Sequence, residues 1–447
     1  MKRILAMLLC LLTLLSVAGC GAEKPAESVT EASDKVSSPV TEKAETEEEK
    51  TEEEGKVVYD KVSDPLTPER VARIPIANSS MTTEQLRQIC VDYVKLSVSF
   101  QWVPNRTFEC EANQGGGTVT KFPEGKLHGG LPYVNVASGN IYRVLEYYDT
   151  ETGVLDMTVF VNKLRHFGTA CSGTTGWGWA RVVNSAEISF TPDMTQHHGF
   201  LKVGPYEYDA SIERFGANGA PDCRDIAKTN GEQVMYQSYA ASKMADCFVN
   251  DGHVRMNGKD PVVVYNADGT IDGDKSYIVQ VEQGLYTTGA YHKRVSADGI
   301  EYVIQGNDGQ YGDGSENYFT FKTLFNTGYL PHSFKELHGL DPVEKAEVTM
   351  EYTNAVFDAK ADDLKGKLLR ANYVISHVIT TVTDANGNQK LRYMKTVHPH
   401  YHYTVDLSEA IPVAGLEPYR QSEGCTIRVE AFLGNGECLL AYEAPLA

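Results

Sequence analysis

The stretch Ala170–Ala180 reads ACSGTTGWGWA, and it decides how the fold of this 447-residue chain is interpreted. If a helix begins at Cys171, its N-terminus lowers the pKa of the thiol and favours the nucleophilic thiolate. Backbone N–H groups at that end could hold an oxyanion, and the glycines would let another segment pack closely. Cys171 is therefore a candidate nucleophile, with Ser172 and Trp177 as possible supporting residues. The alternative is an ordinary buried cysteine.

A cysteine nucleophile needs a base, and His253 is the best candidate along the chain. Polar residues precede His253 and an apolar strand follows it. Glu282 stands near the end of a predicted strand, Tyr277–Gln283, where hairpin pairing could bring its carboxylate to the imidazole. Gln283 could orient the ring instead, and either histidine or glutamate could be an ordinary surface residue.

Several short motifs around these residues resemble one group of enzymes. They are Cys-Ser-Gly before a Trp-rich segment, Ala-Asp-x-x-Val at 245–249, Gly-His-Val at 252–254, and Asn-x-Asp-Gly-Thr-Ile leading to Val-Glu-Gln at 281–283. Over roughly residues 165–285 the chain resembles the NlpC and CHAP families, which are papain-like cysteine hydrolases of bacterial cell walls. The resemblance implies Cys171 as nucleophile, His253 as base and Glu282 as third member. The implied substrate is a peptide or amide bond in the stem peptide of peptidoglycan, and no cofactor is implied.

Three features depart from the family pattern. Ala245 stands where the family usually has glycine, and Gly284 stands where CHAP proteins often place an asparagine. Cys171 and His253 are 82 residues apart, which predicts an insertion at about residues 190–230.

The N-terminus predicts export and lipidation. A basic start precedes the apolar run Ile4–Val17, which is shorter than the roughly 20 residues that cross a bilayer. Val17-Ala18-Gly19-Cys20 follows and resembles a bacterial lipobox, so residues 1–20 are expected to be a lipoprotein signal peptide with diacylglycerol on the Cys20 sulfur. The alternative is an ordinary signal peptide cut nearby. Lipidation implies a cell-envelope protein on the outer face of the cytoplasmic membrane, or on the outer membrane if the host has one.

Residues 21–57 are expected to form a disordered acidic linker. They contain 12 acidic and 5 basic residues and no aromatic residue, so they cannot bury enough apolar surface to fold. The whole chain has a net charge of −19, which argues against nucleic acid as a partner.

The rest of the chain predicts an α+β fold in two domains. Residues 58–340 are expected to be the papain-like domain, with N-terminal helices plus an antiparallel sheet. A capping box at Thr82 and Gln85 predicts a helix over Thr82–Ser97. Residues 131–161 are interpreted as short strands and turns. Three further strands are predicted, at Cys247–Met256, Pro261–Tyr265 and Tyr277–Gln283.

Residues 341–447 are expected to be an all-β, sandwich-like domain. Alternating patterns flank turns that contain Asn-Gly or Gly-Asn-Gly. The predicted strand pairs are Tyr373–Thr383 with Gln389–Tyr403, and Thr426–Leu433 with Glu437–Tyr442.

Seven of the nine cysteines remain after Cys10 leaves with the signal peptide and Cys20 takes lipid. Seven is odd, so at least one cysteine is expected to lack an intramolecular disulfide. The turn at 434–436 would place Cys438 opposite residue 432, which argues against a bridge to Cys425.

The strongest competing site is His398-Pro399-His400-Tyr401-His402. Alternate residues of a strand share a face, so three imidazoles could bind zinc or copper. A strand spaces them roughly 6–7 Å apart, and Pro399 implies an edge strand, so no metal site is expected. Three functions remain open: a tethered peptidoglycan hydrolase, a non-catalytic envelope-binding lipoprotein with a papain-like fold, and a metal-dependent enzyme.

Overall fold

A computed structural model describes most of the chain from Val57 onward. The described residues are 57–111, 119–134, 139–158, 168–184, 200–212, 214–284, 292–352, 367–397, 403–407, 416, 418–419 and 424–446. The predicted signal peptide and lipobox, residues 21–56 of the linker and the histidines at 398–402 lie outside them. Among the described residues, no helix has both the length and the apolar character needed to cross a membrane.

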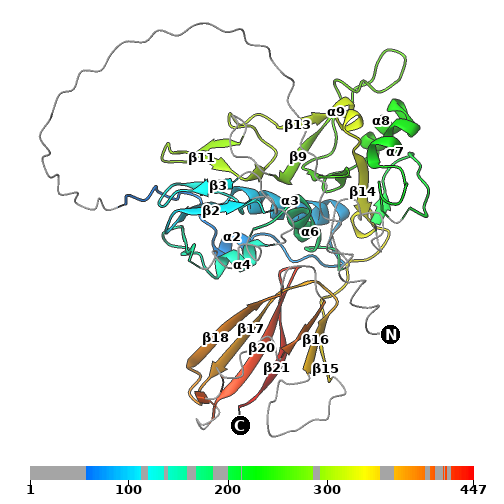
Figure 1. Ribbon diagram of the computed structural model, residues 1–447. Coiled ribbons are helices and arrows are strands. Elements are labelled where there is room, and N and C mark those ends of the chain that lie inside the picture. Colours follow the sequence, from blue (N-terminus) through cyan, green and yellow to red (C-terminus); the bar gives the residue numbers. More distant parts are fainter. Residues whose placement is uncertain are drawn as a thin grey trace, which may run out of the picture. The chain divides into compact units, whose positions relative to one another are not determined.

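The unit Val57–Ala447 is an α+β structure with few helices and several sheets, as predicted at that level (Figure 1). Its central sheet is antiparallel and holds the residues of interest. The strand order is β12 (Gly306–Asn307), β9 (Tyr277–Gln283), β8 (Val254–Asn257), β7 (Cys247–Val249), β14 (Leu330–Phe334) and β6 (Phe200–Lys202), with β13 (Tyr318–Thr320) also paired to β9.

Two helices, α3 (Thr83–Ser99) and α6 (Cys171–Trp179), pack together on one face of this sheet (Figure 1). The predicted capping box of α3 is present in both directions. The glycine-rich segment is helical and begins at Cys171. A Cβ on Gly178 would lie 2.7 Å from Val94 of α3, so glycine permits the close approach of the two helices.

The other face of the sheet carries a second group of helices: α7 (Cys223–Asn230), α8 (Glu232–Ala241) and α9 (Phe321–Asn326). Phe248 and Ile278 of the sheet share a hydrophobic cluster with these helices, whereas Met256 and Val281 share one with α3 and α6. Both faces are therefore covered. The described part of the predicted insertion, from residue 200, supplies β6 and α7.

A second sheet has five strands, three from before the central sheet in the chain and two from after β9. Their order is β10 (Lys293–Val295), β11 (Glu301–Ile304), β4 (His128–Gly129), β1 (Gln101–Pro104) and β5 (Val154–Leu155). A separate hairpin and two short helices accompany it: β2 (Phe108–Glu111) with β3 (Val119–Phe122), α2 (Pro68–Ala72) and α4 (Ile141–Leu145).

Two local predictions need correction. Within residues 131–161 the short strand β5 and turns form as expected, but Ile141–Leu145 is the helix α4, because the Asn140 side chain accepts the Arg143 N–H and caps it. Pro261–Tyr265 is not a strand; only isolated bridges join Val262 to Tyr277 and Tyr265 to Ile271. A proline that donates no backbone hydrogen bond starts this segment and weakens the ladder there.

The C-terminal region holds two further antiparallel sheets. One is β15 (Val348–Tyr352), β16 (Lys367–Ala371) and β19 (Thr404–Asp406); the other is β18 (Gln389–Thr396), β17 (Ile375–Thr383), β20 (Thr426–Leu433) and β21 (Cys438–Pro445). Apolar residues of both sheets form one cluster, with Leu369 on one side and Val378 on the other. Residues 407, 416 and 418–419 are helical, so the expectation of an all-β region is wrong there. A short 3₁₀ helix, η3 (Glu336–His338), lies before this region.

Cysteine placement agrees with the turn argument. Cys438 lies opposite Phe432, and both Cys425 and Cys438 are free thiols. The other free thiols among the described side chains are Cys90, Cys171, Cys223 and Cys247.

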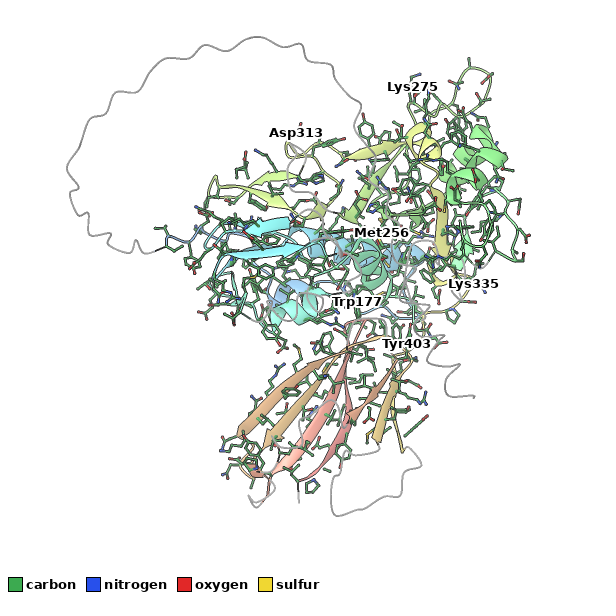
Figure 2. The ribbon with its side chains drawn as sticks, viewed as in Figure 1. Trp177, Met256, Lys275, Asp313, Lys335 and Tyr403 are labelled. Carbon is green, nitrogen blue, oxygen red and sulfur yellow. The ribbon has the colours of Figure 1, made fainter. Side chains whose placement is uncertain are left out.

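Trp177 belongs to the packing between α6 and the C-terminal strands. Trp177 is labelled in Figure 2. The Arg143 guanidinium lies 5.5 Å from the centre of its ring, and a Cβ on Gly434 would lie 3.4 Å from the ring. Arg143 also donates 2.8 Å hydrogen bonds to the carbonyls of Ser376 and Val397. Trp177 is fully buried by these neighbours, which is a structural position.

Candidate active site

Cys171 is the first residue of α6 and follows an extended N-cap residue, Ala170. No side chain caps this end of the helix. The backbone N–H groups of Ser172 and Val254 donate hydrogen bonds to the Cys171 sulfur. The Cys171 residue is 5% exposed, and its sulfur contacts the backbone at the start of β8.

His253 lies in the tight turn between β7 and β8. The Asn250 side chain accepts the backbone N–H of His253 at 2.8 Å, and the Asn250 N–H donates to the His253 carbonyl at 2.9 Å. These two hydrogen bonds hold the turn in shape and fix the position of the His253 backbone, from which the imidazole extends. The His253 side chain hydrogen-bonds to Cys171, and its Nε2 hydrogen-bonds to Glu282 Oε2.

Glu282 lies on β9 and its side chain is 1% exposed. Charged and polar neighbours replace the water that a carboxylate needs. Besides His253, the Nε of Arg255 lies 3.8 Å from Glu282 Oε2. The structure thus brings together Cys171, His253 and Glu282, from a helix, a turn and a strand that are far apart in the sequence.

The local charges adjust the acidity of the cysteine. Burial acts to raise the pKa of Cys171, but the charge of His253, its hydrogen bond and the two backbone donors lower this pKa below its ordinary value overall. The net direction favours the thiolate, which is the nucleophilic form.

The pKa of His253 shifts in the opposite direction to that of Cys171. Burial acts to lower the pKa of His253, yet the charges of Glu282 and Cys171 and the hydrogen bond to the thiol raise it well above its ordinary value. A thiolate beside an imidazolium is therefore the favoured state near neutral pH.

Gln283 and Ser172 lie differently from the three central residues. Gln283 follows Glu282 on β9 and so points to the opposite face of the sheet. Its Nε2 donates a 2.7 Å hydrogen bond to the Leu131 carbonyl. Of the two candidates for orienting His253, Glu282 is the one that contacts the ring. Ser172 is half-buried and contributes its backbone N–H to the sulfur.

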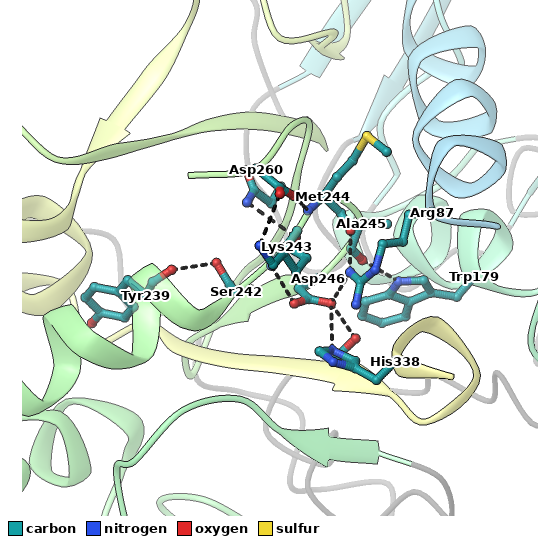
Figure 3. Close-up of polar contacts among 12 residues, drawn as sticks. Arg87, Trp179, Tyr239, Ser242, Lys243, Met244, Ala245, Asp246, Asp260 and His338 are labelled. Carbon is teal, nitrogen blue, oxygen red and sulfur yellow. Dashed lines mark hydrogen bonds and ion pairs between the residues drawn. The ribbon is translucent and has the colours of Figure 1, made fainter. Parts of the chain in front are cut away.

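Asp246, in the Ala-Asp-x-x-Val motif, has a different environment (Figure 3). Its buried carboxylate accepts from Arg87 Nη1 at 2.7 Å and from the Lys243 N–H at 2.7 Å. Ser333 Oγ donates to it as well, and His338 Nε2 lies 3.4 Å away. These contacts tie α3, β14 and η3 to the start of β7, so Asp246 holds the scaffold together.

Arg255 is the neighbour that sequence reasoning missed. It stands two residues after His253, and alternate residues of a strand share a face, so the motif His253-Val254-Arg255 already carried a signal. Among the described residues there is no group of three or more histidine, cysteine or acidic side chains placed to hold a metal ion.

Searches against family models, curated proteins and solved structures find nothing that matches this chain.

Proposed function

We propose that this protein is a membrane-tethered peptidoglycan hydrolase with a papain-like catalytic domain. It cleaves a peptide or amide bond of the stem peptide through Cys171, His253 and Glu282. The observation that carries the proposal is the chain of hydrogen bonds from the Cys171 thiol at the start of α6, through His253, to buried Glu282. A nucleophile, a base and an orienting acceptor in this order suit acyl transfer.

The reaction follows from these positions. The Cys171 thiolate attacks the scissile carbonyl, and backbone N–H groups at the N-terminus of α6 stabilise the oxyanion. The imidazolium of His253 then protonates the leaving amine, and an acyl-enzyme forms. His253, now neutral, takes a proton from water, which attacks the thioester and releases Cys171. Glu282 keeps the ring oriented and stabilises its positive charge in both halves of the reaction.

In this proposal, the N-terminal segment determines where in the cell the protein is held. Lipid on Cys20 anchors the chain in the envelope, and the acidic linker of residues 21–57 lets the catalytic part reach the wall. A coil of this length has a span of roughly 35 Å. The proposed partners are the membrane, through the lipid, and peptidoglycan stem peptides, with no nucleic acid and no cofactor.

A second candidate function is non-catalytic binding in the envelope. The observation that favours it is the low exposure of Cys171, which is 5%. A sandwich-like C-terminal domain would then be the binding part. Reactivity of the thiol separates this candidate from the hydrolase.

The first test is selective alkylation by iodoacetamide, read by peptide mass spectrometry at pH 6. The other thiols serve as internal controls, because burial raises the pKa of Cys90 to about 12 and that of Cys438 to about 11. The hydrolase proposal expects Cys171 to react first, although the Cys438 residue is more exposed. An inert Cys171 supports the binding candidate.

The second test measures the reaction itself. Residues 21–447 and the variant Cys171→Ala are incubated with purified sacculi of several wall chemotypes, and released muropeptides are identified by mass spectrometry. Cys247→Ala is a matched control, since it removes a buried thiol from β7 away from His253. Release by the wild type and the control, but not by Cys171→Ala, is expected. Release by none of them contradicts the hydrolase.

A further inference from the structure

We propose that Arg255 is a positioning residue of the candidate active site, which holds the Glu282 carboxylate in place beside His253 and balances its charge. This inference rests on the proposed function, and it adds a fourth residue that the resemblance to cell-wall hydrolases does not imply. The first observation behind it is the register of strands β8 and β9.

The register of β8 and β9, extended by one residue beyond the last ladder pair, brings Arg255 towards Glu282. Strands β8 and β9 are antiparallel, with Met256 opposite Val281 and Asn257 opposite Gln280. One more step along the ladder brings Arg255 opposite Glu282, on the same face of the sheet. The 3.8 Å separation of Arg255 Nε from Glu282 Oε2 agrees with that register.

The guanidinium is itself held rigidly. It packs against two aromatic rings, 3.9 Å from the ring centre of Phe319 and 4.6 Å from that of Tyr329. Its Nη2 donates to the Tyr329 hydroxyl at 2.8 Å, and its Nη1 donates to Gln280. Arg255 is 7% exposed, so a planar cation fits this slot in one orientation.

The charges of the site explain why a cation is needed there. A thiolate at Cys171, an imidazolium at His253 and a carboxylate at Glu282 would leave one net negative charge in a water-poor site. Buried uncompensated charge is costly, and a carboxylate without a partner takes up a proton. Arg255 brings the sum to zero, so Glu282 stays ionised and keeps His253 protonated.

Other titratable groups around Glu282 do not supply that charge. His292 feels the charge of Glu282, but burial lowers its pKa to about 4, so it is neutral near pH 7. Arg294 pairs with Asp308 at 2.7 Å. Arg255 supplies that charge from 3.8 Å, in addition to the His253 imidazolium that contacts the carboxylate directly.

The test is a double-mutant cycle on the rate of Cys171 alkylation by iodoacetamide between pH 5 and pH 9. The variants are Arg255→Met, Glu282→Gln, the double variant and Arg255→Lys, each checked for folding by circular dichroism. We expect Arg255→Met to lower the rate at pH 6 about tenfold, which corresponds to one unit in the pKa of the thiol. Arg255→Lys keeps the charge but loses the planar stacking, so its rate is expected to fall between those of the wild type and Arg255→Met.

The cycle identifies the route of the effect. If Arg255 acts through Glu282, the double variant alkylates within twofold of Glu282→Gln alone. If Arg255→Met does not fold, the comparison of the double variant with Glu282→Gln alone still tests the proposal. A further tenfold loss in the double variant, or a double variant that does not fold, overturns the proposal, because Arg255 would then serve other partners.

The outcome also separates this inference from the proposed function. A wild-type Cys171 that resists alkylation contradicts the hydrolase before any variant is made. A reactive Cys171 whose pH profile is unchanged in folded Arg255→Met leaves the hydrolase intact and overturns the role of Arg255 alone.

Discussion

The indole N–H of Trp179 donates a 2.8 Å hydrogen bond to the backbone carbonyl of Ala245 (Figure 3). This bond joins the helix that begins at Cys171 to the residue that leads into β7, and β7 ends in the turn that carries His253. Ala245 has a φ of +67°, in the left-handed region that favours glycine. Alanine therefore stands here in a backbone conformation that glycine adopts at lower cost.

This conformation predicts different effects of two substitutions on stability. Ala245→Gly removes left-handed strain of about 1–2 kcal/mol. The same substitution removes a buried methyl group worth about 0.8 kcal/mol. It also raises the conformational entropy of the unfolded chain, which lowers stability by about 0.4–1 kcal/mol. We expect unfolding free energies within about 1 kcal/mol of the wild type in urea titrations. Ala245→Val adds branching at a buried left-handed position and is expected to cost about 2 kcal/mol or more. An Ala245→Val variant as stable as the wild type would contradict this account.

Glu282 and Gln283 are neighbours in sequence with different expected effects. Glu282→Gln removes the carboxylate that stabilises the His253 imidazolium, so the pKa of Cys171 rises towards its ordinary value. We expect its alkylation at pH 6 to slow by about tenfold. Gln283→Met removes a hydrogen bond to Leu131 on the other face of the sheet. It is expected to lower the melting temperature while the shape of the alkylation pH profile stays as in the wild type. Matching pH profiles for the two variants would count against the assigned geometry.

Local patterns predicted much of the fold because they act within a few residues. The capping box of Thr82 with Gln85 needs only one helical turn, and the helix Thr83–Ser99 forms there. The strands Tyr277–Gln283 and Thr426–Leu433 have the predicted bounds, since apolar alternation and adjoining turns mark both ends. The helix Ile141–Leu145 was not predicted, because five residues are too few to show a helical period.

The candidate site was harder to read, because its contacts are long-range. Arg255 looked like a charge in an apolar strand until its register against Glu282 was known. The choice between Glu282 and Gln283 depended on which face of β9 meets His253, and a shift of one residue would exchange them. Sequence alone supplied candidates for each role, whereas strand pairing determined which of them touch.

Asp246 is expected to affect stability and not the reactivity of Cys171. Asp246→Asn leaves the buried guanidinium of Arg87 without its anionic partner, which costs about 3–5 kcal/mol for a buried pair. We expect a clear loss in urea unfolding, with normal alkylation of Cys171 in the folded fraction. Glu351→Gln is the matched control, because the Glu351–Arg370 pair is about half exposed. That control should change stability by less than about 1 kcal/mol. Equal losses in the two variants would mean that Asp246 has no special structural role.

His377 predicts how stability depends on pH. It is buried and stacked on Phe432 with ring centres 4.8 Å apart, and burial with the nearby charges of Arg143 and Arg392 lowers its pKa to about 3. The unfolded chain binds a proton at about pH 6.5, which the folded site does not accept. The unfolded state therefore holds more protons between these values, so stability falls as pH falls below about 6.5.

The variant His377→Phe tests this linkage directly. Phenylalanine keeps the stacking on Phe432 and binds no proton, so it removes this contribution to the acid loss. Between pH 6.5 and pH 5 we expect the wild type to lose about 2 kcal/mol more unfolding free energy than the variant. Urea titrations at both pH values measure the difference. His253 serves as the contrast: its pKa is raised in the folded state, so its contribution is full below about pH 6.5 and is lost as pH rises through the folded pKa. An acid loss that is the same in His377→Phe and the wild type would show that His377 is protonated in the folded state.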